Sequence, residues 1–363
     1  MRSRRTRRTF RGIRPVPDVW FAIPGDISTL TGGYAYARRL MQALPATGWF
    51  PHHLPLPAGF PNPTADDLAA TRAILAALPP ETPVLADGLA YGAIPRALLE
   101  EFELSLTALV HHPLAEETGL SESAVAQFKE SERAALRLAQ SVVATSRHTV
   151  ETLARDYGVS RNHLYLAPPG TDRAARAAQT NTVPKLLTVA TLTHRKAHDV
   201  LIPALATLID LPWTSVLVGS QDLDPQVTRK VQDLIQEYKL NDRVTLVGEL
   251  RNADLEAAYA GADIFVLPSR HEGYGMVFAE ALAHGLPIVA CAAGAVTETV
   301  PADAGLLVPP DDPAALAAAL RRVLSDQAYR QKLSDAAWAH GQALPTWDDT
   351  AAFVAEALWN ALP

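Results

Sequence analysis

Short apolar runs alternate with amphipathic segments along most of the chain. The runs "DVWFAIP" at 18–24 and "ADIFVL" at 262–267 lack in–out alternation, which is typical of strands covered on both faces. The segment 122–140 instead repeats apolar residues such as Val125 and Phe128 near one helical face. Further strands are expected within 82–88, 104–113, 141–146, 162–172, 185–193, 214–220, 243–250 and 286–293, and helices within 31–44, 147–158, 197–209, 224–240 and 346–362. This alternation predicts parallel α/β sheets.

The alternation stops at the small, polar stretch "RAARAAQTNTVP" and then restarts. We therefore expect two doubly wound domains, at 15–172 and 185–344, with a linker at 173–184. Ligands of such sheets bind at the carboxyl ends of the strands, so the sequence predicts a binding cleft between the domains. The last segment, 345–363, is expected to be a helix that either crosses back to the first domain or caps the second.

Composition narrows the class of protein. The 363 residues are 48% hydrophobic, and no apolar run reaches the roughly 18 to 20 residues of a membrane span. The single cysteine, Cys291, excludes an internal disulfide, and its apolar surroundings favour a buried strand thiol over a nucleophile. We expect a cytoplasmic protein.

Charge is distributed unevenly along the chain. The net charge of -7 includes a basic segment, 1–14, with seven arginines and no acid. Such a block is usually disordered and is suited to contact with anionic lipid at the cytoplasmic face of a membrane. The rest of the chain is acidic and has no pattern of basic and aromatic residues, which argues against nucleic-acid binding.

Two acids eight residues apart stand out in "SRHEGYGMVFAEALAHGLPIVA" at 269–290. Gly273 and Gly275 allow positive φ and a close approach of the backbone to a ligand. A helix from about Gly275 would aim free N–H groups at anionic oxygens. Eight residues at about 1.5 Å each place Glu272 and Glu280 up to roughly 12 Å apart, which is the span of a nucleoside diphosphate sugar. One acid would bind sugar hydroxyls and the other the ribose diol, although a lone pair at this spacing is usually coincidental.

The residues around this pair make it more specific. The chain from 268 to 311 resembles the family-four retaining glycosyltransferases, which use nucleotide sugars and have the GT-B fold. The matching residues are Glu272, Gly273, Tyr274, Gly275, Glu280, Ala281, Gly285, Pro287, Val289, Ala290, Gly294, Glu298, Gly305, Leu307, Val308, Pro310 and Asp311, with Ala295 in place of a glycine. The resemblance implies an α/β protein of two Rossmann-like, doubly wound domains facing a central cleft.

The resemblance extends to the first half of the chain. Gly32 and Gly33 match a glycine pair that faces the donor phosphate and the acceptor in that family. His111 matches a histidine that contacts the hexose, and His112 replaces the acid that follows it. The stretches 52–67 and 111–123 are the least family-like, and we expect them to be loops on the acceptor side.

The positive charges match only in part. Lys196 matches the lysine that binds the diphosphate, but Thr191 stands at the usual arginine position. Arg195 is the alternative second cation, although an orientation toward solvent is equally compatible with the sequence. The resemblance thus implies the catalytic candidates Glu272, His111, Lys196 and Arg195, and the substrate-binding candidates Gly32, Gly33, Gly273, Tyr274, Gly275, Met276, Val277, Glu280, Glu249 and Leu250.

The resemblance further implies a retaining hexosyltransferase that uses a nucleotide-diphosphate sugar, needs no metal or other cofactor, and acts on a glycan, lipid-linked or small-molecule acceptor. Cations and helix amides would stabilise the departing diphosphate. Attack by the acceptor on the leaving-group face is favoured over a protein nucleophile. The pair Asp222 and Asp224 is interpreted as a loop and helix cap rather than a metal site. A silent nucleotide-sugar-binding protein and a GT-B epimerase remain the alternatives.

Overall fold

Two six-stranded sheets, parallel throughout, organise residues 17–363, the part of the chain that the computed structural model describes. The basic segment 1–14 lies outside these residues. The first sheet has the order β2-β1-β3-β4-β5-β6, with β1 at Asp18–Pro24, β2 at Phe50–Leu56, β3 at Pro83–Asp87, β4 at Ser105–Val110, β5 at Ser141–Ala144 and β6 at Leu164–Leu166. The second has the order β12-β11-β10-β7-β8-β9, with β7 at Lys185–Val189, β8 at Thr214–Val218, β9 at Val244–Gly248, β10 at Ile264–Leu267, β11 at Ile288–Cys291 and β12 at Gly305–Val308.

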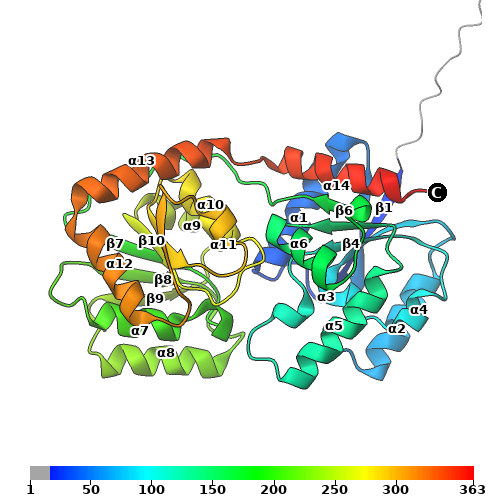
Figure 1. Ribbon diagram of the computed structural model, residues 1–363, viewed down its shortest axis with the longest axis horizontal. Coiled ribbons are helices and arrows are strands. Elements are labelled where there is room, and N and C mark those ends of the chain that lie inside the picture. The colour runs from blue at the N-terminus through cyan, green and yellow to red at the C-terminus, as the bar shows by residue number, and fades with distance from the viewer. Residues whose placement is uncertain (1–16) are drawn as a thin grey trace, which may run out of the picture.

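Helices cover both faces of each sheet, and the two domains lie side by side (Figure 1). The first domain contains α1 (Gly32–Ala43), α2 (Ala65–Ala76), α3 (Gly88–Tyr91), α4 (Arg96–Leu99), α5 (Glu122–Leu136) and α6 (Arg147–Asp156), with 3-10 turns η1 (Leu44–Thr47), η2 (Leu114–Glu116) and η3 (Arg161–His163). The second contains η4 (His194–Lys196), α7 (His198–Ala206), α8 (Pro225–Glu237), α9 (Asn252–Ala260), α10 (Met276–Ala283), α11 (Val296–Thr299), α12 (Pro313–Ser325) and α13 (Gln327–Ala343). The predicted fold of two doubly wound domains is confirmed.

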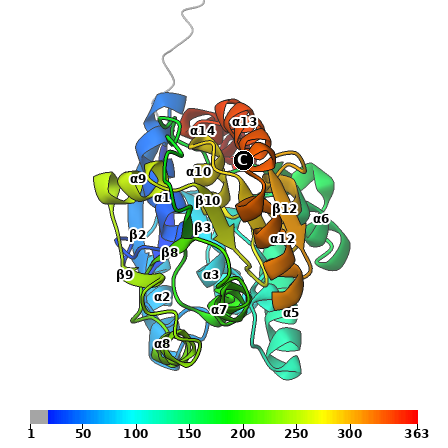
Figure 2. The same cartoon turned by 90° about the vertical axis from the view of Figure 1, so that its left-hand side faces the viewer.

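The last helix, α14 (Trp347–Ala361), belongs to the core of the first domain. Trp347, Val354 and Leu358 are buried in one cluster with Phe21 of β1 and Leu40 of α1. Figure 2 shows α14 continuing past α13 on the same side of the molecule. The chain thus passes between the domains twice.

Those two passages run beside each other. Thr171 N donates to Pro345 O at 2.8 Å, and Gly170 is so close to Trp347 that a Cβ atom would lie 2.3 Å from the Trp347 nitrogen. The predicted linker, 173–184, has no regular structure but is fixed to the second domain, because Ala177 N donates to His284 O at 2.9 Å and Arg173 donates to carbonyls of 341 and 344. The crossing therefore lies slightly earlier, at about 168–172.

The expectation of a loop at 52–67 is wrong at both ends, because residues 52–56 belong to edge strand β2 and residues 65–67 to α2. The stretch is rich in proline, which suggested a loop, and two prolines, Pro51 and Pro55, lie within β2. In β2 they are four residues apart and therefore place their nitrogens on the same side of the strand. That side is open to solvent, where proline is tolerated.

No helix within residues 17–363 is both long enough and apolar enough to span a bilayer. Cys291 is buried at the end of β11, as the sequence predicts. Asp224 caps α8, with its carboxylate accepting from Val227 N at 3.1 Å.

Candidate functional site

Four segments meet where the two domains face each other. Each segment follows a strand or begins a helix near the carboxyl end of a strand. They are the start of α1 with Gly32 and Gly33, the residues after β4 with His111, the turn η4 with Lys196, and the loop 268–275 after β10. A Cβ atom on Gly33 would lie 3.5 Å from the His111 ring, and one on Gly32 would lie 3.9 Å from Met276 Sδ of the other domain. The structure thus brings the predicted glycine pair, His111 and the start of α10 together.

Gly273 serves contact between the domains. A Cβ atom there would lie 2.2 Å from the carbonyl oxygen of His111, so no larger residue fits. Gly273 is thus required for the close approach of the two domains, and its contact with a ligand stays a prediction. Gly275 has φ +83 and begins α10, as the sequence predicts.

Glu272 is the centre of a buried ionic cluster. Only 5% of it is exposed, and its carboxylate accepts from Lys196 Nζ at 2.5 Å, Ser269 Oγ at 2.6 Å and Arg195 Nη1 at 3.2 Å. Burial disfavours the ionised carboxylate, but the charges of Lys196 and Arg195 outweigh it and lower the pKa of Glu272 to about 2. Glu272 is therefore an anion at neutral pH.

The two cations come from one turn. η4 is followed by Ala197, whose φ of +53 is unusual for a residue with a Cβ atom, and this conformation turns the chain into α7. Burial lowers the pKa of Lys196, while Glu272 acts in the opposite direction. Arg195 lies in the cluster and not in solvent, since it also approaches Glu117 Oε1 at 3.3 Å and donates to His271 O at 3.1 Å.

Glu280 has a different environment. It is half-buried on α10 and accepts from the Tyr259 hydroxyl at 2.7 Å. Burial raises its pKa above the usual range. Leu250 packs against the apolar cluster that contains Tyr259, and Glu249 pairs with Arg251 at 3.6 Å. Leu250 thus packs against the cluster that contains Tyr259, the hydrogen-bond partner of Glu280.

The glycine-containing loop after β11 contacts the backbone of Glu272. Ala295 N donates to Glu272 O at 2.9 Å. Gly294 has φ +57, and a Cβ atom on it would lie 2.4 Å from Glu272 O, so a larger residue does not fit. Ala295 has φ -76, so its departure from the glycine of the family pattern needs no unusual backbone. Glu298 reaches across to the first domain, where it accepts from Arg147 N at 3.0 Å at the start of α6.

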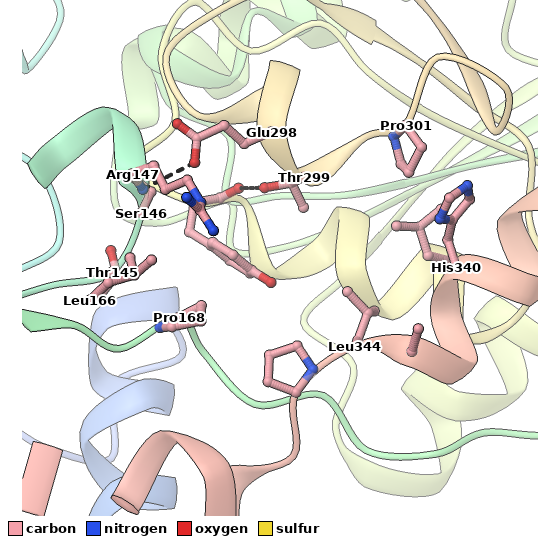
Figure 3. A pocket seen from close by; sticks show the side chains of 14 residues that line it. Thr145, Ser146, Arg147, Leu166, Pro168, Glu298, Thr299, Pro301, His340 and Leu344 are labelled. Atoms are coloured by element: carbon pink, nitrogen blue, oxygen red, sulfur yellow. Dashed lines mark hydrogen bonds between the residues drawn. The ribbon is translucent and has the colours of Figure 1, made fainter. Parts of the chain in front are cut away.

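A cavity of about 380 Å³ lies between the domains on the other side of this loop (Figure 3). Arg147, Glu298 and Thr299 line one part of it, and His340 and Leu344 lie across from them. Tyr274 is the one predicted site residue that lines it, and burial raises the pKa of its phenol to about 12. Val277 is half-buried on α10 and packs against the second domain's core.

Sequence reasoning missed several residues of the cluster. Ser269 and His271 flank Glu272, so their position in the motif was an available signal. Glu116 and Glu117 carried none, because only the fold brings η2 to the second domain, where Glu116 lies 3.4 Å from His271 and Glu117 meets Arg195.

Electrostatically, the junction combines an anion with two cations and the amino end of α10. Its cations can change partner from Glu272 to an entering anion, and Glu272 then has acceptor oxygens free for hydroxyl groups. This arrangement suits a ligand that carries both phosphate and several hydroxyls.

Known proteins that are similar to this chain include glycosyltransferases. Residues 172–340 match the family model "Glycosyl transferases group 1". A D-inositol 3-phosphate glycosyltransferase of Xylanimonas cellulosilytica is 31% identical over 229 residues, which are 58% of this chain and 54% of that protein. A mannosylfructose-phosphate synthase of Agrobacterium fabrum is 31% identical over 166 residues, 41% of this chain and 37% of that protein. The chain thus matches about half or less of the length of these curated relatives.

The solved structure of sucrose-phosphate synthase from Thermosynechococcus elongatus is similar over nearly the whole chain. It superposes with a TM-score of 0.79 at 27% identity and covers 94% of this chain and 98% of its own. The similarity therefore includes both domains and their mutual arrangement, which is the GT-B fold.

Proposed function

We propose, from the match of residues 172–340 to glycosyl transferases group 1, that this protein transfers a sugar from a nucleotide sugar to an acceptor hydroxyl. The observation that carries the proposal is the buried cluster of Glu272, Lys196 and Arg195, which opens onto His111 and the glycine pair of the opposite domain.

We infer from the family resemblance that the sugar is a hexose and that it is transferred with retention and without a metal ion. Lys196 and Arg195 would bind the diphosphate and stabilise the charge that develops on it as the anomeric C–O bond breaks. Glu272, released from its cations, would accept from hexose hydroxyls, and Glu280 from the ribose. The acceptor oxygen would bond to the anomeric carbon on the face that the diphosphate leaves, and the acceptor proton would pass to a phosphate oxygen.

The donor can be tested without knowing the acceptor. UDP-, GDP- and ADP-sugars would be screened for thermal stabilisation and for slow hydrolysis. One series should raise the melting temperature and be hydrolysed in the presence of EDTA. NMR of the glycoside formed with an acceptor should show the donor's anomeric configuration. Absence of stabilisation by every nucleotide sugar would refute the proposal.

Two further readouts separate the alternatives. A silent binding protein would be stabilised by a nucleotide sugar but would never hydrolyse it, and an epimerase would convert the donor alone into an isomer visible by NMR. Intact mass after incubation with donor should show no sugar adduct. An adduct on Glu272 would instead establish a protein nucleophile.

The acceptor panel should begin with phosphorylated small molecules, because the names of the three relatives above all include a phosphate compound. Lipid-linked and glycan acceptors follow. Contact of segment 1–14 with a membrane is tested separately, by sedimentation of full-length and 15–363 protein with phosphatidylserine vesicles.

A further inference from the structure

The 3-10 turn η2 of the first domain is held in place by helix α5. Glu132 of α5 is 1% exposed, and its carboxylate accepts from Leu114 N at 3.0 Å. Pro113 and Leu114 are buried beside it. Glu116 and Glu117, which follow Leu114 and contact the second domain, therefore lie on a turn that is held by burial and by a hydrogen bond to Glu132.

Arg195 lies between carboxylates of the two domains. Its Nε lies 3.3 Å from Glu117 Oε1, and its Nη1 lies 3.2 Å from Glu272 Oε2 and 3.1 Å from His271 O. Glu117 also approaches His112 Nε2 at 3.6 Å and accepts from Thr118 N at 2.9 Å. Within residues 17–363, Lys196 and Arg195 are the cations that pair with Glu272.

A guanidinium is planar, so a partner that holds Nε also fixes the direction of both Nη groups. Glu117 approaches the Nε edge, whereas Glu272 takes an Nη group. An anion that displaces Glu272 from Arg195 would leave the contact with Glu117 intact. Glu117 is thus placed to orient Arg195 before and after a ligand enters.

We propose that Glu117 is a positioning residue, which aims Arg195 at the donor diphosphate and does so only when the two domains are in contact. The inference rests on the proposed glycosyltransferase function. It names a residue of the first domain that completes the cation site of the second. Separation of the domains would remove Glu117 from Arg195 and leave the guanidinium without its orienting partner.

The consequence is a split between turnover and binding. Glu117→Gln keeps the shape but loses the charge that orients Arg195, so turnover should fall. Binding of a nucleoside diphosphate should not weaken, because an acid near the diphosphate site has been removed. Glu117 is 43% exposed, which limits such a pair, and we expect about a three- to fivefold loss of turnover.

The test is a double-mutant cycle with Glu117→Gln and Arg195→Gln in the full chain. Donor hydrolysis gives turnover, and titration with the matching nucleoside diphosphate gives Kd. If Glu117 acts through Arg195, adding Glu117→Gln to Arg195→Gln changes turnover no further, and Kd of the single Glu117 variant stays within about twofold of the wild type. Glu122→Gln, an exposed acid at the start of α5, is the matched control and should match the wild type.

Multiplicative losses in the double variant, or unchanged turnover in Glu117→Gln, would overturn this inference while leaving the proposed function standing. A rise in Kd parallel to the loss of turnover would also overturn it, since that is the result of a merely structural defect. Failure of the wild type to bind any nucleotide sugar would overturn both.

Discussion

Glu272 and Glu280 belong to one sequence motif, yet the structure gives them opposite chemistry. Glu272 lies at the junction of the domains among Lys196, Arg195 and Ser269, and its pKa falls to about 2. Glu280 lies half-buried on α10, where the neutral hydroxyl of Tyr259 is its one side-chain donor among residues 17–363, and burial raises its pKa. The spacing of the motif sets where the acids lie, and their neighbours set their charge. We therefore expect Glu272 to act on the reacting sugar and Glu280 to bind the nucleoside.

The largest effect should come from removing the cation that keeps Glu272 charged. Lys196→Met leaves a buried carboxylate with Arg195 as its remaining cation, so the free energy of unfolding should fall by about 3–5 kcal/mol. Denaturant unfolding at pH 7 measures this loss. Lys230→Met is the matched control, because Lys230 pairs with Asp199 at 2.8 Å but is 58% exposed, and less than about 1 kcal/mol is expected there.

A loss for Lys196→Met no larger than for Lys230→Met would show that Glu272 is not held as an anion by its neighbours. The contrast with Glu280 would then have no electrostatic basis.

Glu272→Gln should have the largest effect on catalysis. The amide keeps the size of the side chain but cannot accept equally strongly from sugar hydroxyls or balance Lys196. Turnover should fall by about 10²- to 10³-fold, as when one preorganised transition-state group is lost elsewhere. Donor hydrolysis under saturating donor measures it. A loss seen only in KM would instead assign Glu272 to ground-state binding, the role expected of Glu280.

The two acids should also give stability an opposite dependence on pH. The folded pKa of Glu272 lies below its unfolded value, so its contribution is present above about pH 4.5 and is lost as pH falls toward 2. The amount is up to about 3 kcal/mol. The folded pKa of Glu280 is raised, so its contribution is present below about pH 4.5 and is lost as pH rises through the folded value.

Chemical unfolding of the wild type, Glu272→Gln and Glu280→Gln between pH 3 and 8 separates the two contributions to stability. Glu272→Gln should reduce the change of unfolding free energy with pH below about pH 4.5. Glu280→Gln should reduce that change above about pH 4.5. If both variants changed the same side, the assigned charge states would be wrong.

The sequence predicted which elements form the site better than it predicted the contacts within the site. The buried parallel strands predicted the doubly wound fold, the family resemblance supplied Lys196, His111 and the glycine pair, and such a fold brings groups at strand ends together. β2 was missed because its prolines imitate a loop. The contact of Gly273 with the first domain was missed because the group that needs its space, His111 O, is far away in the sequence.

Contacts between the domains are what no local pattern encodes. Glu117 reaches Arg195, and Glu298 reaches Arg147 N, only after both domains have folded and docked. The orientation of Arg195, which the sequence left open, follows from these tertiary contacts. A motif thus predicts the groups of a site more readily than the partners that set their charge and direction.

Glu280→Gln should have the smallest effect, and it tests whether Glu280 binds the nucleoside. The amide oxygen can still accept from the Tyr259 hydroxyl, so stability at neutral pH should change by less than about 1 kcal/mol. The ribose diol loses a charged acceptor, and KM for the donor should rise by about tenfold, the effect of one charged hydrogen bond. Turnover at saturating donor should change little, because the ribose does not change charge in the reaction. A variant that loses turnover like Glu272→Gln, at an unchanged KM, would place both acids at the reacting sugar and end the distinction between the two ends of the motif.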